Sequence, residues 1–182
     1  MVVRIIPQSL IFSFLSLHLS TGQILQYEIT PNGFTSPPKG WNSFALQAVG
    51  QLTYDQQHVQ EQCDYMSHYL GSSGYQYCSL DSGWSVGDHG DDYGRIIFDT
   101  SLFNLSALAE HLHKYDMLLG VYVVPGFFAS DANKTIYGTD PPIELSTISN
   151  GNCGVNDRCQ FNYSAPGVQE YCNSVVNLFA EW

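Results

Sequence analysis

The residues best suited to chemistry lie in the segment Asp81-Ser-Gly-Trp84, which follows a short apolar and aromatic run at residues 75–80. If Leu80 packs on helices, the alternation of a strand turns Asp81 toward the opposite face. A carboxylate beside an indole suits a sugar, because the carboxylate accepts from hydroxyls and the aromatic face packs on the C–H side of the ring. The alternative is an aspartate that only shapes the turn, and the residues alone leave both roles open.

Two further aromatic residues belong to the expected strands, one at a strand end and one within a strand. Phe44 closes the first expected strand, near residues 40–44, where core packing is its alternative role. Tyr122 lies within the third, on the face opposite Val121 and Val123. We expect its hydroxyl near the same end of the sheet, although a buried structural tyrosine fits the pattern about as well.

Other kinds of chemistry find little support. The acidic segment Asp88-His-Gly-Asp-Asp92 lacks the spacing of a calcium-binding loop, which favours a solvated hairpin over a metal site. His111 and His113 are two residues apart on an expected helix, so they face different directions. Phosphate-loop, nucleophile-elbow and HExxH motifs are absent. We therefore expect neither a metal ion nor a cofactor.

Composition limits the kinds of partner. Of the 182 residues, 44% are hydrophobic and 14% aromatic, which is enough for a folded core. Six Lys and Arg against 17 Asp and Glu give a formal net charge of −11 at pH 7. This charge disfavours nucleic acid and anionic membranes as partners, whereas it is compatible with neutral sugars.

Residues 1–22 have the pattern of a secretory signal peptide. Arg4 precedes a mainly apolar run, and the small residues Ser20-Thr-Gly22 follow it. Pro7 and several polar residues leave the run too short for a membrane anchor. We expect cleavage after Gly22, secretion to the extracellular space and a mature portion of residues 23–182. Three sequons for N-glycosylation agree with secretion, at Asn104, Asn133 and Asn162.

Five cysteines remain after residue 22. Cys153 and Cys159 flank a short polar loop and are expected to form a local disulfide in an oxidising compartment. Cys63 and Cys78 are the next candidate pair, because both are expected on the contact side of a helix and a strand. Cys172 is then left over. The spacing does not fit a zinc site.

Expected strands and helices alternate along the chain. Helices are expected after the capping box Thr53-Tyr-Asp-Gln56, from residue 105 and from residue 168, although Asn104 could serve as a helix cap rather than a glycosylation site. Strands are expected at 40–44, 75–80 and 117–124, the last buried on both faces because it is continuously apolar. A long polar loop follows, over residues 125–163. This order indicates a parallel α/β sheet.

A doubly wound sheet and a (β/α)8 barrel both fit that order. The long loops after the strands favour the barrel, whose active sites lie at the carboxyl ends of the strands. The third helix is still apolar at Phe179-Ala-Glu-Trp182 and has no cap. We expect an α/β fold, the first three βα units of a TIM barrel, with the chain ending before the fourth strand. A small complete three-unit domain is the alternative.

Several ordered motifs resemble those of a known family. They are Ser36-Pro-Pro-Lys-Gly-Trp-Asn-Ser-Phe44, Gly74-Tyr-Gln-Tyr-Cys-Ser-Leu-Asp-Ser-Gly-Trp84, Leu119-Gly-Val-Tyr122 and Phe179-Ala-Glu-Trp182. In order and separation they are similar to P-P-M-G-W-N-S-W, G-Y-x-Y-x-x-I-D-D-C-W, L-G-I-Y and F-A-x-W of family 27 glycoside hydrolases, the α-galactosidase or melibiase family of clan D. The similarity is good over residues 34–124 and weaker through the long loop.

The resemblance implies a (β/α)8 catalytic domain of a retaining exo-glycosidase with two catalytic aspartates. In the family both aspartates follow later strands, so the resemblance places the nucleophile and the acid/base beyond Trp182. What carries over is substrate recognition. Asp81 matches the first Asp of D-D-C-W, which binds sugar hydroxyls, and Tyr122 matches the tyrosine of L-G-I-Y.

The sequence departs from the family at three of these positions. Ser82 stands where the family has its second Asp, Phe44 where it has the Trp that walls the sugar pocket, and Gly83 where it has Cys. A hydroxyl binds a sugar OH more weakly than a carboxylate does. An altered hexose or pentose preference is therefore expected.

The sequence thus predicts a secreted α-galactosidase-like hydrolase that acts on terminal α-linked sugars. Its expected substrate-binding residues are Phe44, Asp81, Ser82, Trp84 and Tyr122. A carbohydrate-binding pseudoenzyme of the same fold and a small secreted interaction protein are the alternatives.

Overall fold

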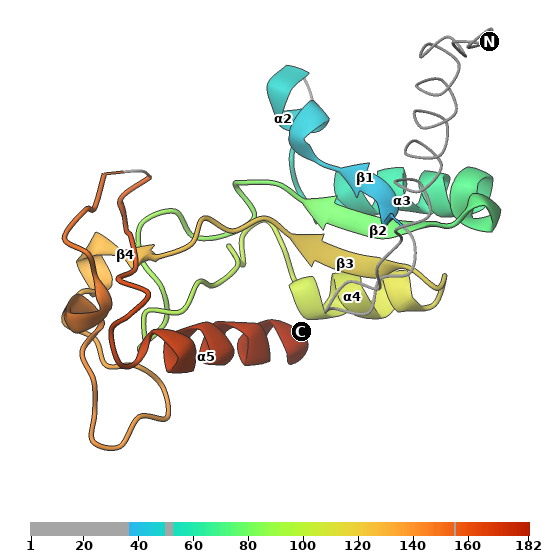
Figure 1. Cartoon of the computed structure of the whole chain (residues 1–182). Helices are drawn as coiled ribbons and strands as arrows, with labels where there is room; N and C mark the ends of the chain where they lie inside the picture. Colours follow the sequence, from blue (N-terminus) through green and yellow to red (C-terminus); the bar gives the residue numbers. More distant parts are fainter. Residues whose placement is uncertain (1–36, 50–52, 155) are drawn as a thin grey trace, which may run out of the picture. The chain divides into compact units, whose positions relative to one another are not determined.

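A parallel sheet of three strands positions the residues of interest (Figure 1). The computed structural model describes residues 37–49, 53–154 and 156–182, so the predicted signal peptide at 1–22 lies outside the described residues. Strands β1 (Lys39–Asn42), β2 (Tyr75–Leu80) and β3 (Leu118–Val121) lie in the order β1-β2-β3. Asn42 is opposite Ser79, and Leu80 is opposite Val121. The carboxyl ends of the three strands therefore meet at one edge.

Two crossover helices cover the sheet with a hydrophobic core. Helices α3 (Gln56–Leu70) and α4 (Leu105–His113) contact each other, and α3 packs on β2 while α4 packs on β3. Their apolar side chains recur at helical spacing and share one buried cluster with Leu80. Leu80 is fully buried there, so Asp81 leaves the strand on the opposite side.

The first and third strands are shorter than the sequence predicted. Strand β1 ends at Asn42, whose Oδ1 accepts from the Phe44 backbone N–H at 2.8 Å, and Phe44 opens a short helix, α2 (Phe44–Val49). The prediction that residues 117–124 are buried on both faces is wrong. Leu118 and Val123 are 43% and 37% exposed, because β3 is the outer strand of the sheet among the described residues.

The segment that the sequence presented as a long polar loop, residues 125–163, carries structure of its own. Strands β4 (Phe127–Phe128) and β5 (Arg158–Cys159) pair antiparallel, and short 3-10 helices cover Ala129–Asp131 and Leu145–Ile148. Another 3-10 turn, Gly71–Ser73, leads into β2. Phe127, Leu145 and Ile148 are among the members of a second buried cluster. The segment is thus a small layer with a core of its own. The sequence did not predict this layer, because its hydrophobic residues stand singly between polar ones and show no helical or strand periodicity.

Helix α5 (Val168–Ala180) joins the two cores. Val168 and Tyr171, near its start, belong to the second cluster, whereas Phe179 packs on the first. Val175, between them, contacts both. No helix in the described ranges has the length and apolar character needed to cross a membrane.

Side-chain caps fix where α3 and α4 begin. Asp55 precedes α3 in an extended conformation, and its Oδ1 accepts from the His58 N–H at 3.0 Å. The sequence favoured Thr53 for this position, but the helix starts two residues later. Asn104 caps α4 by accepting from the Ala107 N–H at 3.1 Å, which is the capping role that the sequence left open.

Both disulfides expected from the sequence are present. Cys63 of α3 is bonded to Cys78 of β2, with Cα atoms 5.8 Å apart, and this bond ties the helix to the centre of the sheet. Cys153 is bonded to Cys159. Cys172 is free and half-buried.

Candidate functional site at the carboxyl edge of the sheet

Asp81 and Tyr122 emerge side by side from neighbouring strands. The parallel ladder continues one residue past the strands, because the Tyr122 N–H donates to the Leu80 carbonyl at 2.8 Å and the Ser43 N–H donates to the Ser79 carbonyl at 3.0 Å. Asp81 follows Leu80 directly. The structure therefore brings the ends of all three strands, with their polar side chains, to the same edge, as barrel topology requires of a site.

A buried hydrogen-bond network holds the Asp81 backbone in place. The fully buried Ser43 Oγ accepts from the Asp81 N–H at 2.8 Å and donates to the Tyr54 hydroxyl at 3.1 Å. Tyr54 in turn donates to the Asp81 carbonyl at 3.0 Å. Burial raises the pKa of Tyr54 to about 12, so its hydroxyl remains a donor at any physiological pH. Sequence reasoning missed both residues, although Ser43 lies in the first motif.

The Asp81 carboxylate is half-buried and has one oxygen engaged. Its Oδ1 accepts from the Ser82 N–H at 2.8 Å and lies 3.4 Å from the Ser82 hydroxyl. The turn-shaping role that the sequence allowed for Asp81 is thus real. Its Oδ2 has no partner within the described residues, so one carboxylate oxygen is available to a ligand hydroxyl.

Trp84 is part of the core rather than an open stacking surface. Only 1% of it is exposed, and its ring makes edge contacts with Phe179 and Trp182 at centroid distances of 6.0 and 5.9 Å. Its Nε1 donates to the Tyr122 carbonyl at 2.8 Å, which fixes the loop after β2 to the end of β3. A direct contact between Trp84 and a sugar remains a prediction.

A hollow of about 270 Å³ opens beside this edge. Three of the five predicted substrate-binding residues line it, namely Ser82, Trp84 and Tyr122. Asp81 and Phe44 are not in its wall. Phe44 is 61% exposed at the start of α2, on the β1 side of the same sheet edge. The wall also includes Arg158, which sequence reasoning did not single out.

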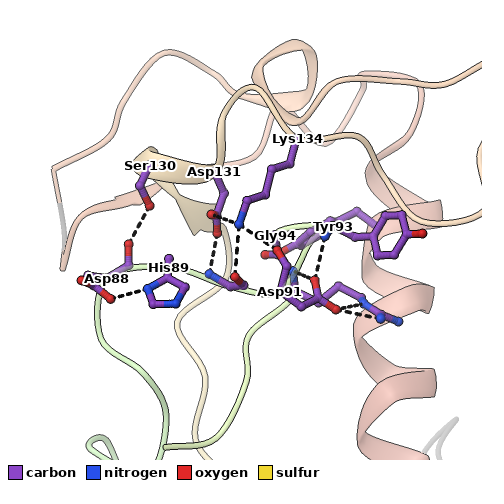
Figure 2. Close-up of polar contacts among 11 residues, drawn as sticks. Asp88, His89, Asp91, Tyr93, Gly94, Ser130, Asp131 and Lys134 are labelled. Atoms are coloured by element: carbon purple, nitrogen blue, oxygen red, sulfur yellow. Dashed lines mark hydrogen bonds and ion pairs between the residues drawn. The ribbon is translucent and has the colours of Figure 1, made fainter.

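The acidic segment 88–92 is bonded into the protein (Figure 2). Asp91 pairs with Arg95 at 2.7 Å and accepts from two backbone N–H groups of its own turn. The buried Asp131 accepts from the Gly90 N–H at 2.7 Å, and the Lys134 ammonium lies 2.6 Å from its other oxygen as an ion pair. The described residues contain no cluster of three metal-ligating side chains. Asp91 and Asp131 thus hold the loop in place, whereas Asp88 and Asp92 are exposed.

The three sequon asparagines are all exposed. Asn104 uses only its Oδ1 in the helix cap, and Asn162 uses its Oδ1 to accept from the Ser164 N–H. Their side-chain nitrogens therefore stay accessible, so capping and glycosylation are compatible at Asn104. Glycosylation itself remains a prediction.

Proteins of known identity resemble this chain in sequence and in fold. No family model matches the chain. It is 39% identical over 176 residues to alpha-galactosidase 3 of Hypocrea jecorina, covering 88% of this chain and 27% of that protein. It is 29% identical over 138 residues to the alpha-galactosidase of Coffea arabica, covering 72% of this chain and 35% of that protein. Its fold is similar to that of a family 27 β-L-arabinopyranosidase from Geobacillus stearothermophilus, with a TM-score of 0.68, 23% identity and coverage of 81% and 38%.

The parallel βα units and the edge that they form have the fold of part of a TIM-barrel glycoside hydrolase. Within this class the chain belongs to family 27, the α-galactosidase family. The chain spans about a quarter of the length of the Hypocrea jecorina relative.

Proposed function

We propose that this chain is the sugar-binding, N-terminal part of a secreted α-galactosidase-like glycoside hydrolase that acts on terminal α-linked sugars. In this proposal β1, β2 and β3 are the first three strands of the (β/α)8 barrel, and the fourth strand follows Trp182. The observation that carries the proposal is the emergence of Asp81 and Tyr122 at one sheet edge, in motifs similar to the family's substrate-binding motifs.

Each edge residue has a distinct part in the proposed site. Asp81 offers a free carboxylate oxygen to sugar hydroxyls, while the network of Ser43 and Tyr54 holds its backbone still. Ser82 contributes a hydroxyl where the family has a second carboxylate, and Tyr122 contributes a phenol from the next strand. Such rigid positioning matters, because a small misplacement of a bound sugar near the reacting carbon costs much of the rate.

The proposed reaction is the retaining hydrolysis of a glycosidic bond by two carboxyl groups about 5–5.5 Å apart. One carboxylate attacks the anomeric carbon while the other protonates the leaving oxygen, and then activates the water that releases the sugar. Both groups are proposed to lie beyond Trp182. We therefore assign neither role to Asp88, Asp91 or Asp92, which are bonded within their own loop or point to solvent.

Two measurements on the 182-residue chain test this proposal. The purified chain should bind D-galactose weakly in ligand-observed NMR, and should release no nitrophenol from nitrophenyl α-galactoside above the buffer rate. Turnover by the chain would contradict the placement of the catalytic pair, and an absence of sugar binding would contradict the recognition role. Sequencing of the messenger RNA past the codon for Trp182 should show an open frame with a Lys-x-Asp motif shortly afterwards. An open frame without that aspartate would favour a carbohydrate-binding pseudoenzyme.

A further inference from the structure

Arg158 is a buried cation without a counter-ion in the wall of the hollow. It is only 7% exposed, and no ion pair involving it is formed within the described residues. Of its five N–H donors, only one on Nη2 has a partner within the described residues, in a hydrogen bond to the Gly126 carbonyl. Its Nε is buried and has no hydrogen-bond partner in the part of the chain that the structure describes. Taking a charge out of water without pairing it is costly, so an arginine in this position is suited to binding an anion.

The acidic group that interacts electrostatically with Arg158, Asp131, does not form an ion pair with it among the described residues. The reason is that the Asp131 carboxylate pairs with another cation. Lys134 pairs with Oδ1, and the Gly90 N–H donates to Oδ2 (Figure 2). The other group that acts on Arg158 is the phenol of Tyr171. Burial raises the pKa of Tyr171, so the phenol stays protonated and therefore neutral.

The guanidinium is also held rigidly in its place. Its carbon lies 4.4 Å from the centre of the Phe128 ring, over which it stacks. The Cys153–Cys159 disulfide and the pairing of β5 with β4 fix the backbone of the segment that carries it. One side of the group is thus fastened to Gly126 and Phe128, while its remaining donors are preorganised for a ligand.

The residues in the wall of the hollow indicate the chemical class of the ligand that Arg158 would bind. Ser82 and Tyr122, which the proposed function assigns to sugar recognition, share this wall with Arg158, and Ser85 and Asn156 add further polar groups. An arginine is the side chain best suited to a carboxylate, because its planar fork matches the two oxygens.

We propose that the hollow binds an acidic sugar, a uronic acid whose carboxylate pairs with Arg158 while its hydroxyls contact Ser82 and Tyr122. This inference rests on the proposed sugar-binding function and specifies its substrate class. The rest of the chain is strongly acidic, so the selection of an anion here depends on this one local cation.

Galactose and galacturonate provide a matched pair of probes, because they differ only at C6. The full chain is titrated with each sugar at pH 7 in low salt, and the dissociation constants are measured by ligand-observed NMR. We expect D-galacturonate to bind about tenfold more tightly than D-galactose, as a charge-assisted hydrogen bond predicts. The preference should decrease as salt is added, whereas the binding of galactose should not change.

Three variants isolate the contribution of the Arg158 charge. Arg158→Gln should abolish the preference for galacturonate over galactose. Lys114→Gln removes the same charge from an exposed side chain that forms an ion pair with Glu110, and it should keep the preference. Ser82→Asp adds a carboxylate to the same wall at an exposed position, and it should reverse the preference even if Arg158→Gln fails to fold.

The outcomes distinguish this inference from the proposed function. Equal affinity of the unaltered chain for the two sugars would overturn the role of Arg158 and leave sugar binding standing. A preference that survives both Arg158→Gln and Ser82→Asp would likewise overturn it. If neither sugar binds, the proposed sugar-binding function fails, and this inference fails with it.

Discussion

Trp84 and Tyr122 are joined by a hydrogen bond of 2.8 Å, from the indole Nε1 of the first to the backbone carbonyl of the second. The two residues follow different strands: Trp84 lies in the loop after β2, and Tyr122 comes directly after β3. The bond therefore fixes how far apart the two recognition segments lie. Because Trp84 is buried against Phe179 and Trp182, it also connects the site to the end of α5.

Trp84→Phe should destabilise the protein by about 1–3 kcal/mol, because the Tyr122 carbonyl loses its donor and the core loses part of a ring. Urea denaturation followed by circular dichroism measures the difference. Tyr122→Phe is the control, since it keeps the backbone carbonyl and removes only an exposed hydroxyl, and its effect should stay within about 0.5 kcal/mol. Equal effects of the two variants would show that the bond does not fasten the loop.

Asp55→Ala should reduce stability at pH 7 by about 1 kcal/mol, because Asp55 caps α3. The His58 backbone N–H, followed by the His58 ring, lowers the pKa of Asp55 below its ordinary value of 3.8. The folded state thus holds its proton less tightly than the unfolded state. The stabilisation is present above pH 3.8 and is lost as the pH falls through the lowered pKa of the folded state.

The control for the cap is Asp55→Asn, which keeps an oxygen acceptor but cannot ionise. Its stability should stay close to that of the unaltered chain at pH 7, and it should lack the acid-dependent loss. Denaturation curves at several pH values between 2 and 7 compare the three proteins. An Asp55→Ala variant that keeps its full deficit at the lowest pH would argue against a role for the ionised carboxylate.

Local patterns in the sequence predicted the elements that carry a periodic signal. The stripe that includes Val59, Cys63 and Met66 predicted α3, and the apolar run before Asp81 predicted β2. The pairing of strands β4 and β5 was not predictable, because two-residue strands have no periodicity and depend on contacts between segments distant in sequence. Burial of residues 117–124 on both faces was inferred from composition, but it depends on which strand lies next to β3.

The candidate site was predictable to a similar degree. Asp81 and Tyr122 follow apolar runs, so their place at the sheet edge could be deduced. Ser43 and Tyr54 act through a network that only the fold assembles. Arg158 lies in a polar disulfide loop, where an exposed position is the ordinary expectation, and nothing in the sequence signals its burial under Phe128.

Removal of the Cys63–Cys78 disulfide should be costly. The bond closes a segment with a sequence separation of 15, so the double variant Cys63→Ala with Cys78→Ala should lose about 3 kcal/mol. Cys172→Ala removes a free thiol and should lose less than about 1 kcal/mol. Peptide mapping without reduction should find Cys172 alkylated and the other four cysteines protected. Alkylation of Cys153 in the unreduced chain would argue against its bond to Cys159.

Asp81→Asn should weaken the binding of D-galactose and, in the complete enzyme, lower kcat/KM. The change replaces an ionised acceptor by a neutral amide, so the hydrogen bonds to sugar hydroxyls lose their charge assistance, at a cost of about 1–2 kcal/mol or roughly tenfold in affinity. The substitution preserves size, and the backbone network through Ser43 and Tyr54 does not involve the side chain, so the fold should persist. Asp92→Asn is the matched control, because it removes the same charge from an exposed loop position and should not alter binding. An Asp81→Asn chain that binds galactose as tightly as the Asp92→Asn chain would remove the Asp81 carboxylate from the site.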